Sequence, residues 1–180
     1  TAWTLTEVVF DNGPYLDDNT VATTTLDASG TTGNIAISAS ADVFTADMIG
    51  AYFRIKTGYV EITSFSSATS VGATVKKDLP DHNATDDWAE GAWSDENGYP
   101  SCVNFYEQRL FFAATDEQPQ TVWGSVSQAY EDMTVTADED ASALVYTIAS
   151  GQVNAIRWLM PGRGLAIGTS GGAFVLSSGS

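Results

Sequence analysis

Cysteine and histidine are nearly absent from this 180-residue sequence, which contains one of each, Cys102 and His82. A single cysteine can form neither an internal disulfide nor a four-cysteine zinc site, which argues against a small secreted disulfide scaffold. Long hydrophobic runs are also missing, since runs such as Arg109–Ala114 fall far short of the roughly 20 residues that a membrane-spanning helix needs. We therefore expect no membrane segment. Thr1–Leu5 lacks a start methionine and basic residues, so no signal peptide is predicted.

Basic residues are scarce as well. Seven Lys and Arg stand against 23 Asp and Glu, which gives a formal net charge of −16. Lys and Arg are absent from residues 1–53 and again from residues 110–156. Such an acidic surface repels phosphate backbones and disfavours wrapping by DNA or RNA. An acidic wall past which DNA slides without sticking remains compatible with this charge.

Helical periodicity is rare, whereas apolar and polar residues alternate with the period of two that is typical of strands. The sequence therefore predicts an all-β fold. A short helical turn is expected at Phe44–Gly50 with Thr45 as its cap, and a tight hairpin with a positive φ at Thr57-Gly58. The expected strands are Thr4–Phe10, Val21–Leu26, Asn34–Ala39, Tyr52–Lys56, Tyr59–Phe65, Ser70–Val75, Ser101–Phe105, Arg109–Ala113, Thr121–Ser125, Ala143–Ile148, Ile156–Met160, Gly164–Thr169 and Ala173–Leu176.

The expected strands group into four regions. Residues 1–32 are predicted to be an N-terminal β segment of the main body, and residues 33–79 a small β-barrel insert, because their strands are short and evenly spaced. Residues 80–99 are polar and acidic and are interpreted as an ordered linker, in which Trp88 and Trp93 anchor the loop by burial. Residues 100–180 are predicted to form propeller-like β-sheets.

Weak internal repetition supports the propeller interpretation. Gln108–Thr115 and Arg163–Thr169 each follow a turn, run apolar and end in a small residue plus Thr. Each is followed by a turn and a second apolar strand, as propeller blades are. Two incomplete blades would leave exposed sheet edges. We therefore expect the region to be truncated, with both chain ends cut from a longer parent, or to be covered in a tight assembly.

Several motifs in the second half of the chain occur together in one known family. They are Trp93–Ala114, Gln118–Ser125, Val153–Leu159 and Leu165–Gly172. In this order they resemble the tail tubular protein B, or nozzle, family of short-tailed phages. The resemblance covers roughly residues 88–180. Val43–Leu79 is similar to an insert named for its likeness to the first catalytic-cysteine half-domain of ubiquitin-activating enzymes, but no matching cysteine is present there, so no ubiquitin chemistry is implied.

The resemblance implies a structural virion protein of the phage tail. It implies a homo-oligomeric ring, six-fold in the best-known cases, with a propeller-like body around a channel through which DNA passes during ejection without specific binding. Other tail proteins, such as the adaptor and the fibres, would be its partners. The chain contains only part of such a body.

No catalytic residues are predicted. His82 lies in the hydrophilic run Asp78–Asp87, which favours a solvent-exposed loop over a catalytic pocket. A Cys102–His82 nucleophile pair is conceivable, but Cys102 alternates with apolar residues and is expected to be packed and inert. With 23 acids, carboxylate pairs at glycosidase spacing arise by chance. We expect no enzymatic activity, no cofactor and no metal site.

An alternative is a carbohydrate-binding or calcium-stabilised β module of a tail fibre or cell surface. Asp17–Asn19, Asp86-Asp87 and Asp138–Asp140 are oxygen-rich, although none has the ligand spacing of an EF-hand. Exposed tryptophans could stack on sugars. Trp123 and Trp158 are expected in the core, whereas Trp3, Trp88 and Trp93 remain candidates for a sugar-binding row.

Overall fold

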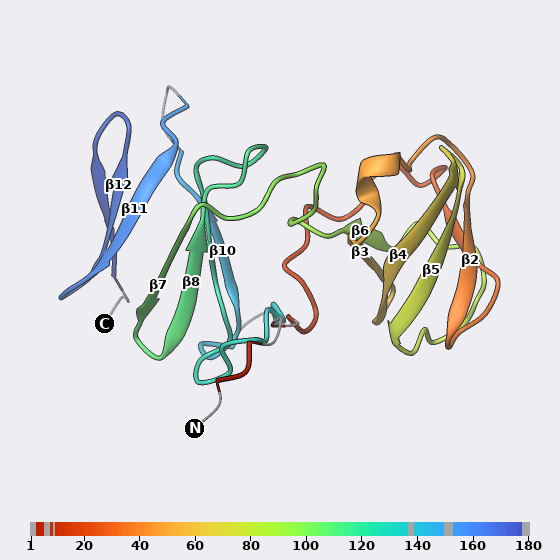
Figure 1. Cartoon of the computed structure of the whole chain (residues 1–180), viewed down its shortest axis with the longest axis horizontal. Coiled ribbons are helices and arrows are strands. Elements are labelled where there is room, and N and C mark those ends of the chain that lie inside the picture. Colours follow the sequence, from red (N-terminus) through yellow and green to blue (C-terminus); the bar gives the residue numbers. More distant parts are fainter. Residues whose placement is uncertain (1–2, 6–7, 9, 137–138, 150–152, 178–180) are drawn as a thin grey trace. The chain divides into compact units, whose positions relative to one another are not determined.

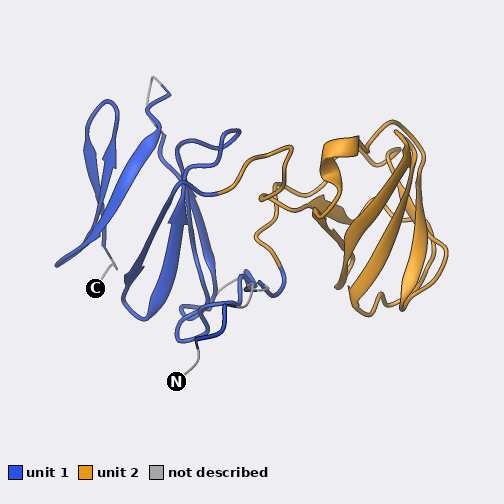
Figure 2. Cartoon of the chain, in the orientation of Figure 1, with its two compact units in different colours: residues 1–12, 100–180 blue, residues 13–99 orange. Residues whose placement is uncertain are grey.

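The computed structural model describes residues 3–5, 8, 10–136, 139–149 and 153–177. The chain forms two compact units, one of residues 13–99 and one of residues 1–12 with 100–180 (Figure 2). Both consist almost entirely of antiparallel strands (Figure 1), which confirms the predicted all-β class. In the described part of the chain, no helix has the length and apolar character needed to cross a membrane.

The unit of residues 13–99 contains one six-stranded antiparallel sheet, curled into a half barrel, in the order β1-β2-β5-β4-β3-β6. Inward-facing apolar residues alternate with polar ones along β2, so Ile35 and Ile37 enter the core. Register shifts along β4 let that long strand bend with the curled sheet. The strands are β1 (Leu26–Ala28), β2 (Asn34–Ala39), β3 (Tyr52–Ile55), β4 (Gly58–Ser67), β5 (Ser70–Lys77) and β6 (Trp88–Glu90), and a short 3-10 helix, η1 (Ala46–Met48), precedes β3.

The core of this unit is aromatic at one end. Phe53 of β3 is fully buried and packs edge-to-face on Phe44, with ring centroids 5.6 Å apart. On its other side it stacks against Trp88 of β6, whose indole Nε1 donates a 3.0 Å hydrogen bond to the carbonyl of Thr24. The indole thus buries its ring and satisfies its one donor.

Two local predictions in this unit need correction. Thr45 is the N-cap residue of η1, but its hydroxyl makes no capping hydrogen bond to the helix backbone. The hydroxyl donates a hydrogen bond to the Glu96 carboxylate instead. The β3–β4 hairpin is present, with Ile55 opposite Gly58, but its positive φ falls on Lys56 and not on Thr57 or Gly58. Gly58 is needed for a different reason: a Cβ there would lie 2.5 Å from the carbonyl oxygen of Asp78.

The unit of residues 1–12 and 100–180 holds two antiparallel sheets, each with its strands in chain order. This up-and-down order is the topology of propeller blades, which usually have four strands. The four-stranded sheet contains β7 (Cys102–Tyr106), β8 (Arg109–Ala113), β9 (Thr121–Gly124) and β10 (Leu144–Thr147), and the three-stranded sheet contains β11 (Ile156–Pro161), β12 (Leu165–Thr169) and β13 (Ala173–Leu176).

The two sheets of this unit pack face to face through one apolar cluster. Phe111 and Ala113 of β8 meet Leu159, Leu165 and Ile167 of the three-stranded sheet in that cluster. The contact is fixed at one edge by polar groups: the side-chain amide of Asn104 donates to the carbonyl of Leu159 at 3.0 Å. Because side chains alternate along a strand, the residues between these inner positions point to the opposite, outer faces of the two sheets.

The observed unit boundaries differ from the predicted regions. Residues 13–32, expected in the main body with the rest of 1–32, belong to the curled sheet and supply β1. Residues 80–99 are not a linker, because they supply β6, which pairs with β3. In the loop that follows β6, the backbone amide of Ala92 donates a hydrogen bond to the carbonyl of Pro14. In the expected strand Thr4–Phe10, residues 6, 7 and 9 lie outside the described residues, and the others are not in a strand. Most of the expected strand Val21–Leu26 is also absent, because Val21–Thr25 form a turn and a loop.

Candidate functional site

The two residues considered for a catalytic pair, His82 and Cys102, belong to different units. His82 is exposed in the loop before β6, in the curled-sheet unit. Cys102 begins β7 in the other unit, where it is half-buried beside the inter-sheet cluster, as a packed cysteine would be. Its sulfur lies 3.7 Å from the hydroxyl of Ser101.

Glu90 is a half-buried carboxylate that the sequence pattern did not single out. Burial raises the pKa of Glu90 above its usual range, and a 2.6 Å hydrogen bond from the Asn97 amide partly offsets this effect. The same amide donates to the carbonyl of Gly91 at 3.2 Å, so Asn97 ties its loop to β6. A raised pKa can mark an acid catalyst. Here the Glu90 carboxyl group accepts the hydrogen bond from Asn97 that helps to hold the loop in place.

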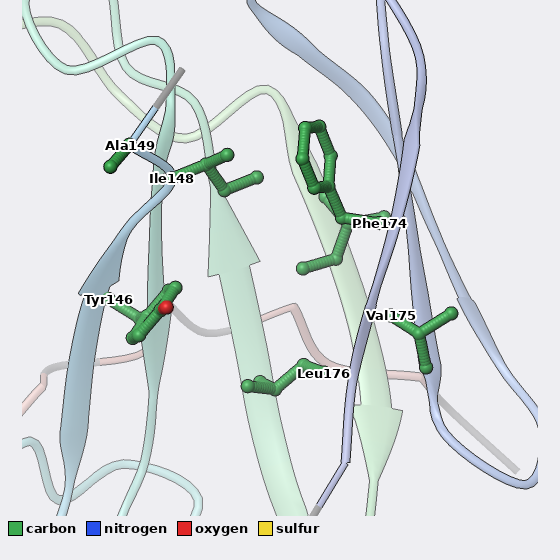
Figure 3. A pocket seen from close by; sticks show the side chains of 7 residues that line it. Tyr146, Ile148, Ala149, Phe174, Val175 and Leu176 are labelled. Atoms are coloured by element: carbon green, nitrogen blue, oxygen red, sulfur yellow. The ribbon is translucent and has the colours of Figure 1, made fainter.

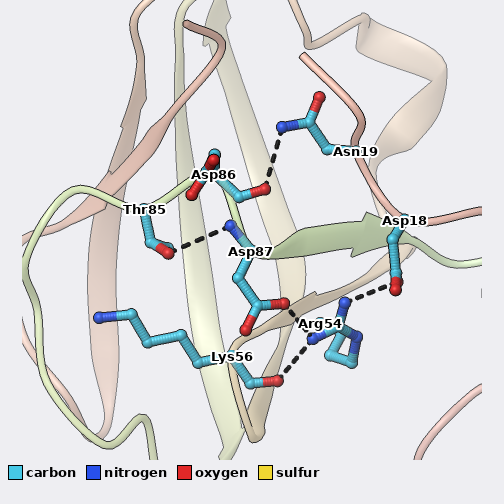
Figure 4. Close-up of polar contacts among 7 residues, drawn as sticks. All are labelled: Asp18, Asn19, Arg54, Lys56, Thr85, Asp86 and Asp87. Atoms are coloured by element: carbon cyan, nitrogen blue, oxygen red, sulfur yellow. Dashed lines mark hydrogen bonds and ion pairs between the residues drawn. The ribbon is translucent and has the colours of Figure 1, made fainter. Parts of the chain in front are cut away.

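Two of the acidic clusters converge on Arg54, as Figure 4 shows. The guanidinium binds Asp18 at 2.6 Å and Asp87 at 2.7 Å, and it also donates to the carbonyl of Lys56 at 2.7 Å. Burial lowers the pKa of Arg54, but the hydrogen bonds to Asp87 and Asp18 outweigh it and leave the pKa raised. Arg54 therefore joins two loops to β3, and these carboxylates act as its counter-ions.

The neighbouring asparagine has a similar structural role. The Asn19 side chain donates to the carbonyl oxygens of Val21 and Thr24, both at 3.1 Å. It also donates to the carbonyl oxygen of Asp86 at 2.9 Å (Figure 4). Among the described residues, no group of three or more His, Cys, Asp or Glu side chains lies close enough to hold a metal ion. Asp138, part of the third acidic cluster, lies outside the described residues, and its neighbours Glu139 and Asp140 are exposed.

Replacing Arg54 tests this reading of the acidic clusters. Arg54→Met is expected to reduce the free energy of unfolding by about 1–2 kcal/mol, because charge-assisted hydrogen bonds are lost at a side chain that is 20% exposed while its partners are partly solvated. Urea denaturation of the purified chain measures the change. The matched control is Lys77→Met, an exposed cation at the end of β5. An Arg54→Met chain as stable as the control would contradict the structural role.

The Lys56–Asp81 pair gives a pH prediction. A 2.6 Å hydrogen bond from Lys56 and a further bond from the Asn83 amide lower the pKa of Asp81. A lowered carboxyl pKa contributes stability above the ordinary value of 3.8, and this contribution disappears as the pH falls through the folded-state pKa. We expect Lys56→Met to move the Asp81 titration, followed by NMR, upward toward its ordinary range. An unchanged titration would show that Lys56 is not the cause.

The solvent exposure of the tryptophans differs in part from what the sequence predicts. Trp123 is fully buried, as predicted, but Trp158 is 46% exposed and its assignment to the core is wrong. Trp88 and Trp93 are half-buried, so both are anchored as expected, and Trp3 is 98% exposed. Trp88 packs against Phe53 inside its unit. Of the three candidates for a sugar-binding row, Trp3 alone is largely exposed.

A groove opens between the two sheets of the unit of residues 1–12 and 100–180. It has a volume of about 250 Å³ and lies between the edge strands β10 and β13 (Figure 3). Tyr146 and Ile148 line one wall, while Phe174 and Leu176 line the other; Val175 points away from the four-stranded sheet. The groove is the solvent-exposed margin of the inter-sheet core and contains no charged side chain.

The outer face of the three-stranded sheet carries mainly apolar side chains. The Trp158 ring lies over Gly168, where a Cβ would come within 1.9 Å of the indole. Met160 is 61% exposed and Val175 is 69% exposed. We call this the C-terminal face; in the strand register it consists of Trp158, Met160, Ala166, Gly168, Ala173 and Val175. Exposed apolar surfaces of this kind mark interaction sites.

A second apolar surface lies on the outer face of the four-stranded sheet. Val103 and Phe105 of β7 are 58% and 57% exposed, and Phe105 packs edge-to-face against Tyr130 with ring centroids 5.1 Å apart. We call Val103, Phe105 and Tyr130 the Phe105 patch. Two exposed carboxylates, Glu107 and Glu131, flank it in the chain.

The two surfaces differ in the charged residues that lie next to them in the sequence. No Asp or Glu occurs after Asp140, so the whole three-stranded sheet is free of acidic residues in a chain of net charge −16. Its charged residues are Arg157, at the irregularity in the β11–β12 pairing, and Arg163, in the turn between those strands; both are exposed. The Phe105 patch, by contrast, is flanked by carboxylates.

Comparison of the sequence with protein-family models gives no match, and no curated protein matches it.

Proposed function

We propose that the chain is a structural, non-enzymatic part of a homo-oligomeric ring that forms a DNA passage channel in a phage tail tube or nozzle. The observation that carries the proposal is the exposed apolar surface on both outer sheet faces of the unit of residues 1–12 and 100–180. Exposed apolar faces on packed sheets are costly in an isolated protein and are typical of a subunit with neighbours.

The charge of the chain supports the channel part of this proposal. A net charge of −16 disfavours tight binding of DNA and suits a wall that must not hold its cargo. The motifs between residues 93 and 172, which resemble those of the nozzle family, point to a phage tail as the setting. Contacts with the adaptor, the fibres and other tail proteins follow from the same resemblance.

Light scattering on the purified chain, with glycan binding measured in parallel, tests the proposal against the sugar-binding alternative. A homo-oligomer without saturable glycan binding is the expected result. A strict monomer that binds a glycan saturably would overturn the ring. Hydrolysis of a glycan or peptide that one carboxylate substitution abolishes would overturn the assignment as a non-enzyme.

A further inference from the structure

We propose that Asn12 is a site of spontaneous deamidation, whereas the fold protects Asn97 from the same reaction. The co-reactant is water, and the proposal does not depend on the proposed function. Both residues precede a glycine, and Asn12-Gly13 and Asn97-Gly98 are the only two Asn-Gly steps in the sequence. Each step also follows an acidic residue, so the sequence alone does not distinguish the two sites.

The reaction needs only the asparagine side chain and the backbone of the next residue. The amide nitrogen of the glycine attacks the side-chain carbonyl carbon of the asparagine, and the side-chain nitrogen leaves as ammonia with the proton of the glycine amide. Water then opens one of the two carbonyl–nitrogen bonds of the cyclic imide, which yields aspartate or isoaspartate. Glycine favours the attack because it has no side chain to hinder the approach of the reacting atoms.

The surroundings of Asn97 oppose this attack. Asn97 is 8% exposed, and its side-chain nitrogen donates to the Glu90 carboxyl group at 2.6 Å and to the carbonyl of Gly91 at 3.2 Å. The backbone amide of Asn97 also donates to the hydroxyl of Ser94 at 3.0 Å. The leaving nitrogen is therefore held by two acceptors inside the loop, and the side chain cannot turn toward Gly98 until both hydrogen bonds break.

Asn12 is held much less firmly. It is half-buried, and its side-chain nitrogen donates to the hydroxyl of Thr134, a neutral acceptor, at 3.0 Å. The next residue has to be glycine, because Gly13 has a φ of 118°, and a Cβ there would lie 3.2 Å from the ring of Tyr15. The backbone conformation therefore requires the reactive Asn-Gly step, while one neutral hydrogen bond holds the side chain in place.

Deamidation would change the charge next to the loop that holds this segment. The Asp132 carboxylate accepts a hydrogen bond from the backbone amide of Thr134 at 2.8 Å, so a new carboxylate at position 12 would contact the same residue as an existing one. Like charges so placed repel each other. We expect this repulsion to weaken the 3.0 Å hydrogen bond from the backbone amide of Met133 to the carbonyl of Asp11.

Peptide mapping by mass spectrometry tests the proposal, with the purified chain incubated in warm, mildly alkaline buffer. In the folded chain, Asn12 should convert at least about tenfold faster than Asn97, because Asn97 must also break a hydrogen bond to a carboxyl group. In guanidinium chloride the two rates should become similar, which makes the unfolded chain the matched control. Equal rates in the folded chain would overturn the proposal, and so would conversion of Asn12 in the unfolded chain alone.

Two variants test the contacts behind these rates. Glu90→Ala removes one acceptor of the Asn97 side chain, so it should raise conversion at Asn97 in the folded chain and leave that at Asn12 unchanged; far-UV circular dichroism checks the fold. Unchanged conversion at Asn97 would overturn the protective role of Glu90. Asn12→Asp imitates the product and should speed hydrogen exchange at the Met133 amide. Unaltered exchange there would overturn the expected effect on the loop.

Discussion

Phe53→Ala is expected to reduce the free energy of unfolding of the unit of residues 13–99 by about 3–5 kcal/mol. Phe53 has no solvent exposure and packs between Phe44 and Trp88, so its removal leaves a cavity lined by two aromatic rings. It lies on β3, an inner strand of the sheet between β4 and β6. Hydrogen exchange along β3, β4 and β6, together with urea denaturation, measures the loss.

Phe65→Ala is the matched control for that substitution. Phe65 lies on β4 of the same sheet, but its side chain is 38% exposed at the far end of the strand. Its removal should cost less than about 1 kcal/mol, in the range of exposed sites. Equal losses for the two variants would contradict the assignment of Phe53 to the centre of this core.

Trp123→Ala should have an effect of similar size in the unit of residues 1–12 and 100–180, about 3–5 kcal/mol. Trp123 is fully buried in β9, an inner strand of the four-stranded sheet, where it pairs with Phe112 on one side and Val145 on the other. Loss of this ring removes the largest buried side chain of that sheet. Tryptophan fluorescence and urea denaturation follow the change.

Trp3→Ala serves as the control, since Trp3 is 98% exposed and its removal should leave stability unchanged. If Trp3→Ala destabilised the chain as much as Trp123→Ala, the exposed position of Trp3 would be wrong. If neither did, the burial of Trp123 would be wrong.

Strand positions in the second half of the chain were predictable from the sequence because their short apolar runs end at clear turns. The expected Arg109–Ala113 and Ala173–Leu176 are the observed bounds of β8 and β13. In residues 1–32 the same alternation was misleading. Alternation marks a strand only where a neighbouring strand is available to pair, and Val21–Thr25 form a turn and a loop instead.

The candidate surfaces were harder to predict, since exposure depends on which sheet face meets the core. Trp158 was expected in the core because it lies in an apolar strand, but a register shift beside it places its ring on the outer face, over Gly168. Residues 80–99 were interpreted as a linker from their acidity. Their carboxylates are instead used locally, where Asp87 binds Arg54 of β3.

Electron microscopy of the assembled chain tests the central claim most directly. The account predicts closed rings with an open centre. Closed two-fold dimers, or particles no larger than one chain at every concentration, would contradict it.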